Sequence, residues 1–153
     1  SEEFARAYWH WFFLIRPAPL PETLIEANPE LYLRSVMGAR SAGMKPFTEE
    51  ALAEYLRCLS LPGTAHGLCE DYRASAGIDL EHDRADVQAE RKLSVPLLVL
   101  WGAEGTVGRC FDPLQEWRRV AVDVRGKALP CGHYIAEEVP QALLEEVLGF
   151  LYA

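Results

Sequence analysis

The sequence lacks an apolar run of the length that a membrane-spanning helix requires. Such a helix needs about 20 consecutive apolar residues, whereas the strongest apolar stretch here runs only from Val95 to Trp101. The acidic pair Glu2-Glu3 also stands where a signal peptide would carry basic residues. We therefore expect a cytoplasmic protein that does not insert into a membrane.

Basic residues are scarce. The 153 residues include 15 Lys and Arg against 23 Asp and Glu, which gives a formal net charge of −8. Arg91-Lys92 and Arg118-Arg119 are the only basic doublets. Because neutralising a phosphate backbone takes clustered basic side chains, nucleic acid is not an expected partner.

The motifs of the common metal, nucleotide and serine sites are missing. The four cysteines form no CxxC pair, and the sequence holds no HExxH, no P-loop and no GxGxxG. We expect packed, reduced thiols, with no metal and no cofactor. None of the six serines lies in a GxSxG elbow, so a serine nucleophile cannot be named.

Residues 1–92 carry amphipathic helical patterns separated by Pro and Gly. Apolar side chains recur at spacings of three and four residues, which places them on one face of a helix. Thr48 is an expected helix N-cap. The first part of the chain is therefore predicted to be all helical, with helices over residues 4–15, 24–36, 48–59, 64–76 and 83–92.

Residues 93–153 switch to alternating strand and helix patterns. The run 95–102 is continuously apolar and ends in glycine, as in a buried parallel strand. A helix over 112–120, a strand over 122–128 and a terminal helix over 136–152 follow. The terminal helix is predicted to turn an apolar face inward, formed by Leu143, Leu144, Val147, Leu148 and Leu151. This order is that of half of an α/β fold with a doubly wound parallel sheet.

A histidine stands in the loop between the second strand and the terminal helix. The segment reads Cys131-Gly132-His133-Tyr134. A base histidine ahead of the last helix can reach a nucleophile at the carboxyl ends of parallel strands, and Gly132 gives the loop freedom to present the ring. His133 is therefore the candidate catalytic base. The alternative for a lone histidine is a structural role.

Several motifs occur in the order and at the spacing of one enzyme family. They are Tyr8-Trp9-His10-Trp11-Phe12-Phe13, Cys69-Glu70-Asp71-Tyr72-Arg73-Ala74, Asp79-Leu80-Glu81-His82-Asp83, Leu100-Trp101-Gly102 and Gly132-His133. By these motifs, nearly the whole chain resembles the haloacetate (fluoroacetate) dehalogenases, a branch of the α/β-hydrolases. The resemblance implies that residues 1–92 form a helical cap. It also implies that residues 93–153 form the C-terminal part of the hydrolase core, with the last two strands and helices of its doubly wound parallel sheet.

In that family an aspartate displaces halide from a small haloacid and forms an ester, which a histidine-activated water hydrolyses. The resemblance makes His133 the water-activating base, and His10, Trp11 and Tyr72 the residues that hold the halide. Donors of N–H and O–H in a dry pocket would stabilise the charge that develops on the halide. The alternatives are a buried helix stripe for Trp11, a core imidazole for His10 and a surface tyrosine for Tyr72.

Other residues of the family's site have no counterpart here. The nucleophilic aspartate, the two arginines that bind the substrate carboxylate and the acid that orients the histidine all belong to the segment before the cap. We therefore expect the isolated chain to be inactive. The loop Gly102-Ala103-Glu104-Gly105-Thr106 has glycine where many α/β-hydrolases carry the acid, and Glu104 is a weak substitute.

Two other interpretations stay open. The same half of an epoxide hydrolase or an esterase would share the scaffold and the histidine, and a non-enzymatic helical interaction module is the further alternative. A strand as apolar as residues 95–100 also requires neighbours on both of its edges. We therefore expect a homodimer that covers the edge of this strand.

Overall fold

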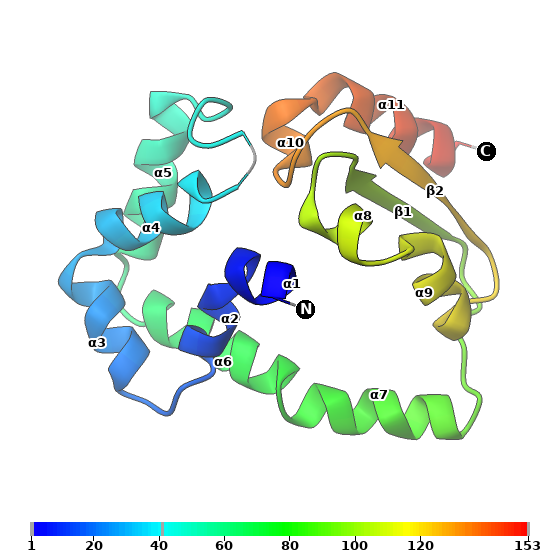
Figure 1. Cartoon of the computed structure of the whole chain (residues 1–153), viewed down its shortest axis with the longest axis horizontal. Helices are drawn as coiled ribbons and strands as arrows, with labels where there is room; N and C mark the ends of the chain where they lie inside the picture. The colour runs from blue at the N-terminus through cyan, green and yellow to red at the C-terminus, as the bar shows by residue number, and fades with distance from the viewer. Residues whose placement is uncertain (1, 41, 153) are drawn as a thin grey trace. The chain divides into compact units, whose positions relative to one another are not determined.

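The computed structural model describes residues 2–40 and 42–152 of the chain (Figure 1). The described residues divide into two units: residues 2–39 and 43–85 form the first, and residues 40, 42 and 86–152 form the second. Helix α7 (Ile78–Gln88) crosses this division, and all of its residues are exposed. The interpretation of residues 1–92 as a cap and 93–153 as part of a core stays a prediction.

The first unit is helical, as predicted. Its other helices are α1 (Glu2–Ala7), α2 (Trp9–Leu14), α3 (Leu20–Ala27), α4 (Pro29–Gly38), α5 (Glu49–Leu59) and α6 (Thr64–Ser75). Thr48 is the N-cap of α5, as expected, because its hydroxyl accepts a hydrogen bond from the Ala51 N–H at 3.1 Å. Asn28 caps α4 in the same way, and therefore the single helix expected over residues 24–36 is two helices.

The core of the first unit joins α2, α3 and α6. Leu14, Ile25, Ala65 and Cys69 bury their side chains together. Burying a leucine or isoleucine side chain contributes about 1.5–3 kcal/mol, so this small cluster fixes the three helices against one another. Tyr72 of α6 packs against the same cluster.

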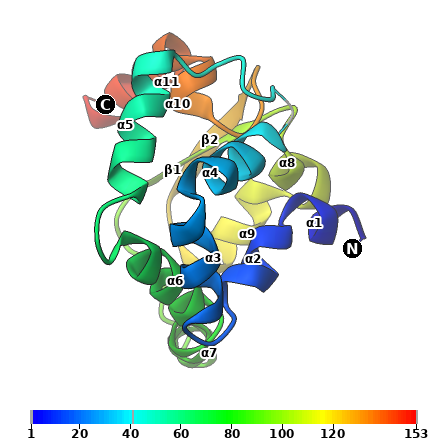
Figure 2. The same ribbon diagram turned by 90° about the vertical axis from the view of Figure 1, so that its left-hand side faces the viewer.

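The second unit contains a parallel strand pair, as predicted. Strand β1 (Leu97–Gly102) pairs with β2 (Val124–Leu129), with Leu97 opposite Val124 and Gly102 opposite Leu129. Its helices are α8 (Thr106–Cys110), α9 (Pro113–Val120), α10 (Ile135–Glu138) and α11 (Pro140–Leu151). Helices α8 and α9 lie on one side of the strands and α11 lies on the other (Figures 1 and 2).

Some predicted element bounds were wrong. The helix expected over residues 83–92 is α7, which begins five residues earlier at Ile78, because α6 ends before Gly77 and the chain re-enters a helix at once. The terminal helix is divided into α10 and α11, since Pro140 lacks the N–H that would continue a single helix. Both strands begin two residues later than predicted, and α8 was not predicted.

The apolar face of α11 is also more exposed to solvent than the sequence predicted. Leu144, Leu148 and Leu151 are exposed, although their spacing predicted an inward face. The helix instead contacts β2 through other residues: Glu146 pairs with Lys127 at 2.5 Å, and Phe150 lies 5.9 Å from the Arg125 guanidinium.

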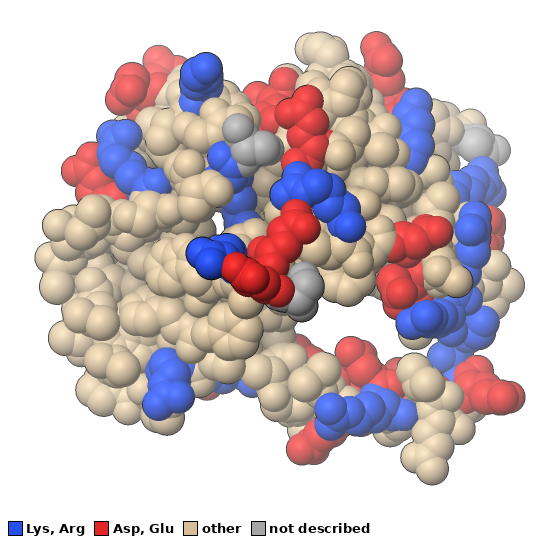
Figure 3. Space-filling model, viewed as in Figure 1, with Lys and Arg blue, Asp and Glu red and all other residues tan. Residues whose placement is uncertain are grey.

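The surface carries both signs of charge. On the face shown in Figure 3, acidic and basic side chains lie interspersed. Among residues 2–40 and 42–152, none of the helices combines the length and apolar character that a bilayer crossing demands.

Candidate functional site

His10, Trp11 and Tyr72, which the sequence assigned to one site, lie together in the first unit. His10 and Trp11 are neighbours on α2, and Tyr72 lies on α6, which packs against α2. The Tyr72 ring meets both rings edge-on, with centroid distances of 5.9 Å to His10 and 5.7 Å to Trp11. Three side chains with N–H or O–H groups therefore meet where these two helices touch.

The three rings differ in their exposure. His10 is 4% exposed, Trp11 is 41% exposed and Tyr72 is half-buried. Among the described residues Trp11 is therefore not buried and Tyr72 is not fully exposed, and the assignment of both to the halide site stays a prediction. His10 fits a core role as well as a binding role, because its ring packs beside Tyr8 and Trp9.

Arg73, which follows Tyr72, ties α6 to the end of α2. Its Nε and Nη2 donate to the Arg16 carbonyl, just beyond α2, at 2.9 and 2.6 Å. Its Nη1 pairs with Glu22 of α3 at 2.8 Å and with Glu70 of α6 at 2.5 Å. The planar guanidinium can make these bonds at once, and they hold α2 against the helix that carries Tyr72.

Glu22 is a buried carboxylate whose charge depends on Arg73. The hydrogen bond from Arg73 lowers the pKa of Glu22 from 4.5 to about 2, whereas burial of the carboxylate acts in the opposite direction. Glu22 Oε2 is buried and has no hydrogen-bond partner among the described residues. Removing Arg73 would leave this buried charge without its guanidinium partner, which is strongly destabilising.

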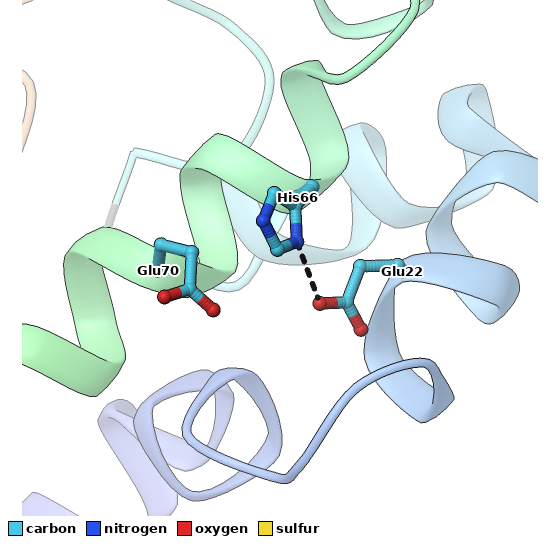
Figure 4. A group of neighbouring side chains, drawn as sticks. All are labelled: Glu22, His66 and Glu70. Carbon is cyan, nitrogen blue, oxygen red and sulfur yellow. Dashed lines mark hydrogen bonds and ion pairs between the residues drawn. The ribbon is translucent and has the colours of Figure 1, made fainter.

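Glu22, His66 and Glu70 lie close enough together to suggest a cation site. Their candidate ligand atoms lie within 4.8 Å of one another, and His66 Nδ1 is 3.4 Å from Glu22 Oε1 (Figure 4). However, Arg73 Nη1 already binds both carboxylates. Because a guanidinium takes the place that a cation would have between them, we assign the group to the ion pair that joins α3 to α6.

His133 lies in the second unit, in the loop between β2 and α10. The Glu138 carboxylate accepts hydrogen bonds from the Gly132 N–H at 2.7 Å and from the Tyr134 N–H at 3.0 Å. The start of the loop is held from the end of β1, since the Glu104 N–H donates to the Cys131 carbonyl at 3.0 Å. The residues on both sides of His133 are thus fixed by hydrogen bonds.

The His133 ring borders a pocket of about 220 Å³ at the carboxyl end of β1. Side chains from β1, α8, α9 and α10 complete the lining. Partial burial lowers the pKa of His133 below its usual value of 6.5, Arg40 lowers it further, and Glu138 opposes both effects. The neutral ring, which can accept a proton, is therefore favoured at pH 7.

Two curated proteins resemble the chain along much of its length. Fluoroacetate dehalogenase from Burkholderia sp. is 37% identical over 148 residues, which are 96% of this chain and 48% of that protein. Soluble epoxide hydrolase from Corynebacterium sp. strain C12 is 35% identical over 130 residues, which are 83% of this chain and 43% of that protein. The chain spans about half the length of these relatives. No family model matches it.

Solved structures show the same relationship. A proposed α/β hydrolase from Nostoc sp. PCC 7120 has a TM-score of 0.91 and 52% identity, covering 99% of this chain and 51% of its own. A proposed epoxide hydrolase from Pseudomonas aeruginosa has a TM-score of 0.90 and 38% identity, with the same coverage. The chain therefore belongs to the α/β-hydrolase family, and its two-stranded sheet is part of that fold. Within the family, the expected resemblance to fluoroacetate dehalogenase is confirmed.

Two residues near the candidate site were not recognised from the sequence. Glu138 had a usable signal, because an acidic residue in the first turn after a loop can satisfy free N–H groups there. Arg73 was noted only as part of a motif. Its bonds to Arg16 and Glu22 join distant segments, and no spacing along the chain predicts them.

Proposed function

We propose that this chain provides the halide-binding cap and the water-activating histidine of a haloacetate dehalogenase. The observation that carries the proposal is the meeting of Tyr72 with His10 and Trp11, at ring distances of 5.9 and 5.7 Å. The similarity to fluoroacetate dehalogenase supports it, since that relative matches 96% of the chain.

The chemistry of the three side chains suits an anion. Imidazole, indole and phenol offer N–H and O–H donors. When a carbon–halogen bond breaks, the halide leaves with the bonding electrons, and donors that are already in place stabilise its growing charge. Fluoride is a poor leaving group and therefore depends on such donors more than chloride does.

His133 would act in the second half of the reaction. An aspartate from outside these 153 residues attacks the α-carbon of the haloacid, expels the halide and becomes an ester. His133 then takes a proton from water, and the water oxygen adds to the ester carbonyl. Collapse of the adduct releases the 2-hydroxy acid and restores the aspartate. The lowered pKa of His133 suits this role, because the base must be neutral.

Epoxide hydrolysis is the second candidate. It is favoured by the 35% identity to soluble epoxide hydrolase and by the structural similarity to a proposed epoxide hydrolase. Opening an epoxide develops negative charge on oxygen, which the donors of the same cluster could stabilise. The two candidates differ in the bond that breaks, so product analysis separates them.

The test uses a fusion in which this chain follows the part of the Burkholderia sp. fluoroacetate dehalogenase that it does not match. This fusion is called the completed enzyme below. We expect it to release fluoride from fluoroacetate, and we expect the isolated chain to release none. An epoxide and a p-nitrophenyl ester serve as competing substrates. Turnover of the epoxide or the ester without fluoride release, or turnover of fluoroacetate by the isolated chain, would overturn the proposal.

The proposal includes a cytoplasmic location and a homodimer. The four cysteines are free, as is usual in a reducing compartment. Beside the strands, Val95 is 61% exposed and Val122 is 71% exposed. A second copy of the chain that covers these side chains would remove apolar surface from water.

A further inference from the structure

Glu138 turns its carboxylate back toward the loop that precedes its own helix. One oxygen accepts a hydrogen bond from the Gly132 N–H at 2.7 Å, and the other accepts one from the Tyr134 N–H at 3.0 Å. These two donors belong to the residues immediately before and after His133. We propose that Glu138 is the positioning residue of His133, holding the loop in the conformation that presents the ring. This inference rests on the proposed function of His133 as the base.

The geometry suits a positioning role because both oxygens are used. A carboxylate is planar, and two N–H groups bound to its two oxygens cannot move independently of each other. Hydrogen bonds to an ionised acceptor are also shorter and stronger than those between neutral groups. Glu138 itself is half-buried and ends α10, whose first turn follows directly from the loop.

The other side of the loop is held separately. The Glu104 N–H binds the Cys131 carbonyl at 3.0 Å, and the Ala103 N–H binds the Leu129 carbonyl at 2.8 Å. These bonds come from the segment after β1 and reach only the start of the loop. The Tyr134 carbonyl accepts backbone hydrogen bonds from Glu137 and Glu138 at 3.0 and 2.9 Å. The N–H groups of Gly132 and Tyr134 are held by the Glu138 carboxylate, and this support fails if the carboxylate is removed.

The pKa of His133 gives a second measurement of the interaction between Glu138 and the loop. Arg40 lowers the pKa of His133 and Glu138 raises it, on top of the lowering by partial burial. Glu138 and Glu104 both raise the pKa of the neighbouring Cys131 thiol, whose burial acts in the same direction. Neutralising Glu138 should therefore lower the pKa of His133 further, because Arg40 is then less opposed.

The first experiment uses the 153-residue chain with the substitution Glu138→Gln. A glutamine side chain has nearly the same shape but one acceptor oxygen, so at least one of the two backbone hydrogen bonds is lost. Glu137→Gln is the matched control, since it removes the same charge one residue away. Nuclear magnetic resonance would follow amide exchange at Gly132 and Tyr134 and the titration of the His133 ring.

We expect at least a tenfold faster exchange at Gly132 or Tyr134 in Glu138→Gln, a lower His133 pKa and no such changes in Glu137→Gln. Exchange rates and a His133 pKa equal to those of the parent chain would overturn the inference. If Glu138→Gln fails to fold, Glu138→Asp provides the measurement. Its shorter side chain keeps the charge but cannot reach both donors, and unchanged exchange in that variant would equally overturn the inference.

The second experiment measures turnover in the completed enzyme. A base displaced by about 1 Å costs up to about 100-fold in rate, so Glu138→Gln should lower kcat by roughly 10-fold to 100-fold. KM should fall together with kcat and kcat/KM should change little, because His133 acts only after the ester has formed and slower hydrolysis lets that ester accumulate. Activity equal to the parent would overturn the positioning role while leaving the proposed function intact. If exchange responds as expected but the parent fusion never releases fluoride, the proposed function fails and the structural role of Glu138 stands.

Discussion

The substitution Gly102→Ala should push the loop that carries His133 away from the end of β1. Gly102 ends β1 and is buried. A Cβ at this position would lie 2.6 Å from the Cys131 carbonyl oxygen and closer still to the Gly132 oxygen, whereas real Cβ atoms essentially never come within 3.0 Å of such atoms. Both obstacles are backbone atoms of the loop, so a side-chain rotation cannot relieve the contact.

The size of the effect follows from this overlap. The loop has to move by about 1 Å or more, and a misplacement of that size costs a catalytic group about 100-fold in rate. Forcing extra volume into a packed site costs about 1–3 kcal/mol of stability. We therefore expect Gly102→Ala to lose about 1–3 kcal/mol in the free energy of unfolding and about 100-fold in kcat in the completed enzyme.

Gly149→Ala is the matched control. Gly149 lies in α11, is exposed, and an added Cβ would have no heavy atom within 4 Å. Alanine is favoured over glycine inside a helix by about 0.5–1 kcal/mol, so this variant should be slightly more stable than the parent. Urea unfolding of both chains gives the comparison. If Gly102→Ala is as stable as Gly149→Ala and leaves the amide signals of the loop unchanged, the packing of β1 against the loop is wrong.

Three further predictions concern the ion pair, the cluster and the assembly. Arg73→Met removes the hydrogen bond that lowers the Glu22 pKa. It should therefore destabilise the chain at pH 7, with a difference from the parent that shrinks as the pH falls from 4.5 toward about 2; urea unfolding across this range checks it, with the exposed pair variant Arg57→Met as control. Tyr72→Phe in the completed enzyme should lower kcat on fluoroacetate by roughly 100-fold, and less on chloroacetate, because fluoride depends more on donated hydrogen bonds; equal losses on both substrates would point to a packing role. Sedimentation of the chain at micromolar concentration should show a dimer, and a stable monomer would contradict the predicted cover for the edge of β1.

Much of the fold could be predicted from local patterns. The apolar run that became β1, the Thr48 cap and the helical character of the first unit all depend on residues near one another in the sequence. The errors in the predicted elements lie where one local sequence pattern was compatible with two structures, a single helix or two shorter ones. Asn28 and Pro140 each divided a predicted helix, because a cap or a missing N–H outweighed a continuous apolar periodicity.

The candidate site shows the same limit. The resemblance brought His10, Trp11 and Tyr72 into one hypothesis, and the structure places them within ring contact. The residues that hold them could not be predicted, since Arg73 bonds to Arg16 and Glu22 only after α2, α3 and α6 have packed. The prediction that the apolar face of α11 points inward was wrong for a related reason. Periodicity identifies an apolar face, but it does not identify what covers that face.

The proposed function is tested most directly by the mass of the His133→Ala completed enzyme after incubation with fluoroacetate. Without the base, the aspartate can still displace fluoride, but water cannot hydrolyse the ester. We predict one fluoride released per enzyme and a mass increase of one carboxymethyl group that persists. Two results would contradict the assignment of His133 as the water-activating base. One is continued turnover by the variant, and the other is failure to release the first fluoride in a variant that folds like the parent.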